Sequence, residues 1–251
     1  MTAFDLSGRW AIVTGANTGI GQAIAVGLAR AGADIVGVGR SAMAETETEV
    51  KASGRRFVSV MADLSRSGSA ATVLSEALAV GATPDILVNN AGIIRRADSL
   101  DFTEEDWDAV LDTNLKSVFF LCQAFARAAI AAGRPAKIIN IASMLSFQGG
   151  IRVPSYTAAK SGLAGITKLL ANEWAARGIN VNAIAPGYVE TNNTTALRAD
   201  AERNADILKR IPAGRWARPE DMAGAAIFLA SPASDYVHGT ILPVDGGWLA
   251  R

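Results

Sequence analysis

The stretch Trp10-Ala-Ile-Val-Thr-Gly-Ala-Asn-Thr-Gly-Ile-Gly21 decides the fold of this chain. It begins with a short apolar run that predicts a buried strand, and residues 22–31 after it predict a helix. Gly15, Gly19 and Gly21 lie in the turn between them. Because glycine has no side chain, backbone amides and the helix N-terminus can approach a pyrophosphate there. The spacing departs from Gly-x-Gly-x-x-Gly, and the turn by itself names no cofactor; a turn that serves only packing is the alternative.

The same alternation of strand and helix continues along the chain. Strands are predicted at 10–14, 34–38, 56–61, 86–89, 137–141, 180–184 and 240–244, and helices at 22–31, 44–52, 67–80, 103–112, 115–132, from about 156 onward, 201–209 and 219–230. This order predicts an α/β fold, with a seven-stranded parallel sheet covered by helices on both faces. We expect a single doubly wound, Rossmann-type domain over residues 1–251, with ligands bound outside the carboxyl ends of the strands.

Composition narrows the classes of partner. The chain has 251 residues, half of them hydrophobic, and its 24 Lys and Arg balance its 24 Asp and Glu, so no basic excess predicts nucleic-acid binding. The single cysteine, Cys122, and the single histidine, His238, predict neither a disulfide framework nor a metal centre. No apolar run reaches about 18 residues, so we expect a cytoplasmic protein with no membrane partner and a small-molecule ligand.

The segment from Ser143 to Lys160 is the candidate active site. Tyr156 and Lys160 are four residues apart on a predicted helix, so their side chains share one face. A cation beside a phenol favours the phenolate and lowers the tyrosine pKa from about 10 toward a range useful for acid and base catalysis. Taken alone, the pair also fits an ordinary surface Tyr and Lys one turn apart.

Seven motifs occur in order, each beside its expected strand or helix. They are Thr14-Gly15-x-x-x-Gly19-Ile20-Gly21, Asp63, Asn89-Asn90-Ala91-Gly92, Asn114, Ser143, Tyr156-x-x-x-Lys160 and Pro186-Gly187. The chain therefore resembles the short-chain dehydrogenase/reductase family over essentially its whole length.

That resemblance implies a role for each matching residue. Tyr156 would be the general acid for ketone reduction, and Ser143 would bind the substrate oxygen. Lys160 would lower the Tyr156 pKa and hold the nicotinamide ribose. Asn114 would position a water molecule that links Lys160 to solvent. The nicotinamide cofactor would supply the hydride. Its binding residues would be Gly15, Asn17, Thr18, Gly19, Ile20, Gly21, Arg40, Asp63, Leu64, Asn90, Ala91, Gly92, Tyr156, Lys160, Pro186, Gly187, Val189 and Thr191.

The end of the second strand bears on which cofactor is used. Gly39-Arg40-Ser41 offers no carboxylate for a ribose 2′-hydroxyl, and Arg40 either meets the 2′-phosphate of NADP or stacks on adenine. Residues 94–96, 141–156, 185–194 and 244–251 resemble, more narrowly, the 2-deoxy-D-gluconate 3-dehydrogenase subgroup of the family, also described as 2-dehydro-3-deoxy-D-gluconate 5-dehydrogenases. That subgroup implies NAD, and we rank NAD first and NADP second.

The subgroup also implies a substrate, an anionic deoxy keto sugar acid. Its carboxylate needs a cation and its hydroxyls need amide or hydroxyl partners. Candidate substrate residues are Arg95, Arg96, Ser143, Gln148, Arg152, Tyr156, Asn192 and Asn193. For each arginine, solvation or pairing with a carboxylate is an equal alternative. Residues 187–198 are expected to be a mobile segment that could close over substrate.

Other functions stay open at this point. Within the family the alternatives are a gluconate 5-dehydrogenase or a 3-oxoacyl carrier protein reductase, and from another class a silent nucleotide-binding protein with the same fold. Retention of Ser143, Tyr156 and Lys160 favours an enzyme. The apolar run at 118–125 and the helix after Tyr156 predict a subunit interface, so we expect a homotetramer. Trp248 fits either an interface or core burial.

Overall fold

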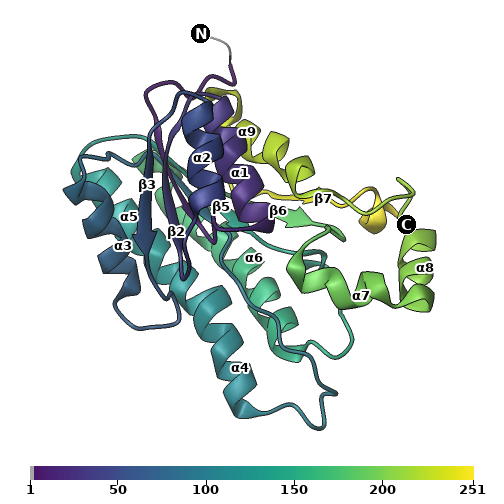
Figure 1. Ribbon diagram of the computed structural model, residues 1–251. Helices are drawn as coiled ribbons and strands as arrows, with labels where there is room; N and C mark the ends of the chain where they lie inside the picture. Colours follow the sequence, from purple (N-terminus) through teal and green to yellow (C-terminus); the bar gives the residue numbers. More distant parts are fainter. Residues whose placement is uncertain (1–2) are drawn as a thin grey trace.

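The computed structural model describes residues 3–251, and its centre is one parallel sheet (Figure 1). Within that part of the chain, the sheet has seven strands in the order β3-β2-β1-β4-β5-β6-β7. The strands are β1 (Trp10–Thr14), β2 (Asp34–Gly39), β3 (Phe57–Met61), β4 (Ile86–Asn89), β5 (Ala136–Ile141), β6 (Ile179–Pro186) and β7 (Ile241–Val244). The strand order reverses between β1 and β4, which leaves a crevice at their carboxyl ends.

Helices cover both faces of the sheet. They are α1 (Gly19–Arg30), α2 (Ala44–Ala52), α3 (Ser69–Ala79), α4 (Glu104–Leu111), α5 (Ser117–Ala131), α6 (Pro154–Trp174), α7 (Thr195–Ala199), α8 (Ala201–Arg210) and α9 (Ala223–Ala230). A single turn of π-helix at Asp112–Lys116 joins α4 to α5, and a 3-10 turn at Met144–Ser146 precedes α6. Helices α7 and α8 stand away from the sheet, beside the C-terminus (Figure 1).

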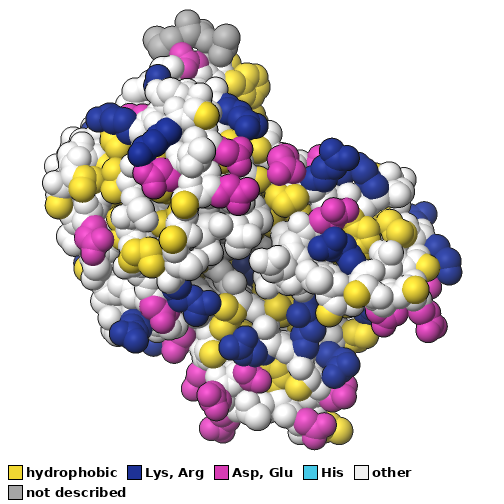
Figure 2. All heavy atoms as spheres, viewed as in Figure 1, with side chains coloured by type: hydrophobic (Ala, Val, Ile, Leu, Met, Phe, Trp, Pro, Cys, Tyr) yellow, Lys and Arg dark blue, Asp and Glu magenta, His cyan; other side chains and the backbone are white. Residues whose placement is uncertain are grey.

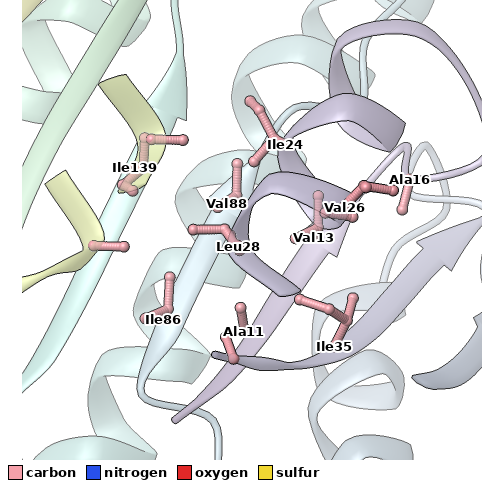
Figure 3. Close-up of a cluster of buried hydrophobic side chains, with 14 of the residues drawn as sticks. Ala11, Val13, Ala16, Ile24, Val26, Leu28, Ile35, Ile86, Val88 and Ile139 are labelled. Carbon is pink, nitrogen blue, oxygen red and sulfur yellow. The ribbon is translucent and has the colours of Figure 1, made fainter. Parts of the chain in front are cut away.

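Alternate residues of each strand point to different cores, as a parallel sheet buried on both faces requires. On one face, Val13, Ile35 and Val88 pack with Ile24 and Leu28 of α1 (Figure 3). On the other face, strand residues such as Ile12 and Ile138 pack against α3, α5 and α6. Each core holds the carboxyl ends of the strands in register and so fixes the positions of the loops that follow them.

The structure confirms the predicted fold class and the place of every predicted element. The largest boundary difference is in α9, which begins at Ala223 after a 3-10 turn at Pro219–Met222 instead of at residue 219. Helix α1 begins at Gly19, inside the glycine turn, instead of at residue 22. The strand predicted at 180–184 continues to Pro186, so the chain breaks only at Gly187. Thr103 is the N-cap of α4, as expected, and its side chain accepts from the Asp106 N–H.

Membrane-spanning helices and metal-binding clusters were searched for among the described residues. Over residues 3–251, no helix combines the length and apolar character that crossing a membrane requires. In the same part of the chain, no group of three or more His, Cys, Asp or Glu side chains is arranged to hold a metal ion.

Candidate active site

A long cavity of about 1610 Å³ lies along the carboxyl ends of the strands. The hollow is visible between the body of the molecule and the lobe made by α7 and α8 (Figure 2). Its walls come from the glycine turn, from the loops after β2 to β6, from the start of α6, from α8 and from Trp248. The cavity therefore sits at the switch point where an open parallel sheet binds ligands.

The glycine turn is shaped by close backbone approach. Gly15 has φ +66°, and a Cβ there would lie 2.8 Å from Asn90 Nδ2 and 3.1 Å from Ala91 Cα. A Cβ on Gly21 would collide with the Gly15 carbonyl, so Gly21 serves packing at this turn and does not line the cavity. The Thr18 N-cap makes no side-chain capping bond, so the first amides of α1 stay available to an anion.

The loop after β4 is tied to this turn. The Thr14 hydroxyl accepts from the backbone amides of Asn90 and Ala91, both at 3.0 Å, and Asn90 Nδ2 donates to the Thr14 carbonyl at 2.9 Å. These bonds cross between the two strands that flank the switch point. They hold Asn90, Ala91 and Gly92 in the cavity wall, at the edge of the sheet where ligand-binding residues were predicted.

Polar groups mark the end of β2. Arg40 and Ser41 line the cavity, and Asn17 Nδ2 donates to the Ser41 hydroxyl at 3.0 Å. Asp63 follows β3, and its carboxylate accepts from the Ser65 hydroxyl at 2.8 Å and from the Ser65 amide. These bonds, the hydroxyl first, hold the Asp63 pKa below its ordinary value, and the charge of Arg40 contributes less. A phosphate at the end of β2 would meet the donors of Arg40 and Ser41, with the Asp63 carboxylate on the neighbouring strand end.

Ser143, Tyr156 and Lys160 come together as predicted. Ser143 follows β5 and caps the 3-10 turn, its hydroxyl accepting from the Leu145 amide at 3.2 Å. Pro154 begins α6 and sets its first turn, which places Tyr156 in the cavity wall beside Ser143. The Lys160 ammonium lies 5.5 Å from the centroid of the Tyr156 ring.

Two serine side chains fasten this loop to the helix. The Ser146 hydroxyl donates to the Lys160 carbonyl at 2.6 Å, and the Ser161 hydroxyl donates to the Leu145 carbonyl at 3.1 Å. The turn that carries Ser143 is thereby fixed against the helix that carries Tyr156 and Lys160.

The expected effect of Lys160 on Tyr156 is not found. Burial raises the Tyr156 pKa, while the hydrogen bond with Ser143 and the charge of Arg96 act in the opposite direction and are smaller. Lys160 is itself buried, 5% exposed, and burial lowers its pKa to about 8. Its ammonium donates to the Ile141 carbonyl at 2.6 Å. In the chain alone, loss of solvent outweighs the Ser143 hydrogen bond and the Arg96 charge, so the Tyr156 pKa moves in the direction opposite to the one expected.

Asn114 lies behind the cavity wall. Its side chain is fully buried in the π-helical turn, where it accepts from the Ile93 amide and donates to the Ile93 carbonyl, both at 2.8 Å. Such single π turns recur at functional sites. Asn114 holds the loop after β4 in place; its predicted water-mediated link to Lys160 stays a prediction.

The predicted substrate residues fall into two groups, those that line the cavity and those that do not. Gln148, Arg152, Asn192 and Asn193 line the cavity together with Arg96. Arg96 donates to the Asn193 carbonyl at 3.1 Å, which joins the loop after β4 to the segment after β6. Arg152 has φ +62° and its Nε lies 3.8 Å from the Asp98 carboxylate.

Arg95 does not belong with this group. It points away into an ion pair with Asp106, 2.9 Å between Nε and Oδ1, and does not line the cavity. Consecutive residues of an extended segment point to opposite sides, so only one of the two arginines can reach the site. The inclusion of Arg95 among the substrate residues was wrong.

Sequence reasoning missed one wall of the site. Helix α8 contributes Arg203, Asp206 and Arg210 to the cavity, and the C-terminal segment contributes Trp248. The spacing of the three charged residues, three and four apart, places them on one face of a helix and was the available signal. Trp248 is buried in a cluster with Tyr188 and Trp216, so core burial describes it within this chain.

Comparison with known proteins agrees with this geometry. A family model described as enoyl-(acyl carrier protein) reductase matches residues 15–249. The chain belongs to the short-chain dehydrogenase/reductase family.

Several similar proteins are named for sugar acids. The chain is 60% identical to the 2-dehydro-3-deoxy-D-gluconate 5-dehydrogenase of Escherichia coli K12, over 100% of this chain and 99% of that one. A crystal structure from Agrobacterium tumefaciens with bound NADP, described as a 2-deoxy-D-gluconate 3-dehydrogenase, shares 62% identity and a TM-score of 0.92, with full coverage of both chains. A gluconate 5-dehydrogenase structure from Beutenbergia cavernae, with NADP at low occupancy, shares 52% identity and a TM-score of 0.95, again over both whole chains.

Proposed function

We propose that this protein is a nicotinamide-dependent dehydrogenase that transfers a hydride between its cofactor and a deoxy keto sugar acid. The observation that carries the proposal is the meeting of Ser143, Tyr156 and Lys160 in one cavity with the glycine turn. The relatives named for 2-dehydro-3-deoxy-D-gluconate and 2-deoxy-D-gluconate support the choice of substrate.

Each catalytic group has a separate task. When bound, the cofactor supplies or accepts the hydride at the reacting carbon. Tyr156, whose burial keeps the phenol protonated, gives its proton to the carbonyl oxygen during reduction and takes it back during oxidation. Ser143 donates a hydrogen bond to the same oxygen as charge develops there. Lys160, fixed by the Ile141 carbonyl, holds a positive charge beside the phenol.

We propose NADP as the cofactor that this chain prefers. The ranking of NAD first has no support from the solved relatives, since both carry NADP. Arg40 and the Asn17 to Ser41 hydrogen bond place donors at the end of β2, where a 2′-phosphate would add negative charge. Gly15 and Gly19 leave the backbone open to the pyrophosphate.

The residues proposed for substrate are those that line the cavity. Arg96 and Arg152 supply cations, and Gln148, Asn192 and Asn193 supply amides for hydroxyl groups. Residues 187–198, which include most of the short helix α7, are proposed to close over the bound substrate.

A gluconate 5-dehydrogenase is the second candidate, since the chain is 52% identical to one so named. Nicotinamide absorbance, followed with NADPH and NADH in turn across keto sugar acids, 5-ketogluconate and a 3-oxoacyl thioester, separates the candidates. We expect the highest kcat/KM with NADPH and a deoxy keto sugar acid. Turnover of the thioester alone would overturn the proposal.

The subunit interface is also a proposal. Phe120 of α5 and Leu169 of α6 are 47% and 49% exposed although both are large and apolar. We propose that the α5 and α6 faces pair between copies in a homotetramer. Light scattering of the purified protein tests this, and a monomer at micromolar concentration would contradict it.

A further inference from the structure

The wall formed by α8 and the C-terminal segment has its own polar cluster. Arg210, the last residue of α8, lies with its guanidinium carbon 4.1 Å from the centroid of the Trp248 ring. Trp248 is 5% exposed, and its indole N–H donates to Gln148 Oε1 at 3.3 Å. Arg210 also donates to Gln148 Oε1, at 3.3 Å. Three segments far apart in sequence therefore fix one arginine at the cavity.

Arg210 has no ion-pair partner among residues 3–251. Asp206 on the same helix and Asp200 at its N-cap are engaged elsewhere. Asp206 lies 3.4 Å from the Lys209 ammonium, and Asp200 caps α8 by accepting from the Arg203 amide at 3.0 Å. An oriented guanidinium with unused N–H donors is suited to a planar anion, which it binds through two parallel hydrogen bonds.

Gln148 is oriented by the same contacts. Its Oε1 accepts from two N–H donors, so its Nε2 must point elsewhere. Nε2 has no acceptor among the described residues, and Gln148 lines the cavity. The amide thus offers N–H donors beside the guanidinium.

The other arginines near the site are placed differently. Arg95 is paired with Asp106, and Arg152 lies near Asp98. Arg96 acts electrostatically on Tyr156, so it lies at the reacting end of the substrate. The wall away from the carbonyl being reduced carries Arg203 and Arg210, and of these two Arg210 is the one whose guanidinium is fixed by contacts with Trp248 and Gln148.

We propose that Arg210, held on Trp248 and by Gln148, binds the carboxylate of the substrate, with Gln148 Nε2 donating to the same carboxylate or to the neighbouring hydroxyl. This inference rests on the proposed function, because it takes the substrate to be a sugar acid. It makes the α8 wall the part of the site that selects acids over neutral sugars.

The test compares a keto sugar acid with its methyl ester in two variants. Arg210→Gln should raise the KM for the acid about tenfold or more and change the KM for the ester less than about twofold, because only the acid loses a charge-assisted contact. Gln148→Glu should produce the same selective loss while its unfolding temperature does not fall, since the new carboxylate pairs with Arg210. Arg177→Gln removes the same charge at an exposed side chain outside the cavity lining and should leave both KM values unchanged.

Measuring binding as well as turnover distinguishes a failure of this inference from a failure of the proposed function. The acid and the ester are titrated into the NADP-bound enzyme and its variants, followed by tryptophan fluorescence. Equal losses for acid and ester, or none, overturn the role of Arg210 even if the wild type reduces sugar acids. Selective binding of the acid through Arg210, with no turnover by the wild type, retains the inference and overturns the proposed function.

Discussion

The two halves of the cavity are built in different ways. The half formed by the glycine turn and the loops after β2 to β4 is shaped by the close backbone approach of Gly15 to Ala91 and by backbone amides of Asn90 and Ala91 that donate to the Thr14 hydroxyl. The half formed by Gln148, Arg210 and Trp248 depends on side chains that meet from three distant segments. Backbone geometry leaves little choice of residue, whereas side-chain walls can be changed without altering the sheet. On the proposed assignment, the cofactor half of the cavity is therefore tied to the fold, and the substrate half is not.

The catalytic residues join the two halves, and removing the proton donor should have the largest effect. Tyr156→Phe should lower kcat by about 10²- to 10⁴-fold, the usual contribution of general acid catalysis. The affinity for NADPH, measured by fluorescence titration, should stay within about twofold. Substantial residual activity would remove Tyr156 from the proton-transfer step.

Burial of Lys160 should appear as a dependence of stability on pH. Its pKa is about 8 in the folded chain and 10.5 ordinarily, so between these values the unfolded chain binds more protons and the free energy of unfolding rises with pH. Below pH 8 the full cost of the buried charge, about 3 kcal/mol, is present. Urea unfolding of the wild type and of Lys160→Met from pH 7 to 10 measures it. A parallel pH dependence in the two proteins would contradict this assignment.

Gly15→Ala tests the backbone-built half. The new Cβ would crowd Asn90 and Ala91 at a positive φ, so both stability and NADPH affinity should fall, stability by about 1 to 3 kcal/mol. Gly54→Ala is the matched control, since its φ is +72° and a Cβ would meet no atom within 4 Å. A melting temperature lowered equally in both variants would show that strain alone, and not the close approach, matters at Gly15.

The smallest expected effects separate two neighbouring arginines. Arg95→Ala should leave the KM for substrate unchanged within about twofold, because this side chain makes only an exposed ion pair with Asp106. Arg96→Ala should raise the apparent pKa in the profile of kcat against pH, because the positive charge of Arg96 lowers the Tyr156 pKa. Identical pH profiles of the wild type and Arg96→Ala would place Arg96 outside the electrostatic reach of Tyr156.

Much of the fold and part of the site could be predicted from sequence. Strand and helix positions follow from local apolar patterns, and the glycines of the turn mark positions where a Cβ has no room. The motif around Tyr156 and Lys160 is local, because one helix carries both. The separation of Arg95 from Arg96 was not predictable, because it depends on which side of one loop faces the cavity.

The sequence by itself determined the order of strands and motifs along the chain, the glycine turn, and the set of Ser143, Tyr156 and Lys160. Each of these rests on short-range geometry. Only the tertiary structure decided the direction of the Tyr156 pKa and the presence of Arg210 at the site. Burial depends on everything that packs around a group, and Arg210 meets Gln148 and Trp248 across gaps of 62 and 38 residues. Such contacts exist only once the sheet has brought the loops together.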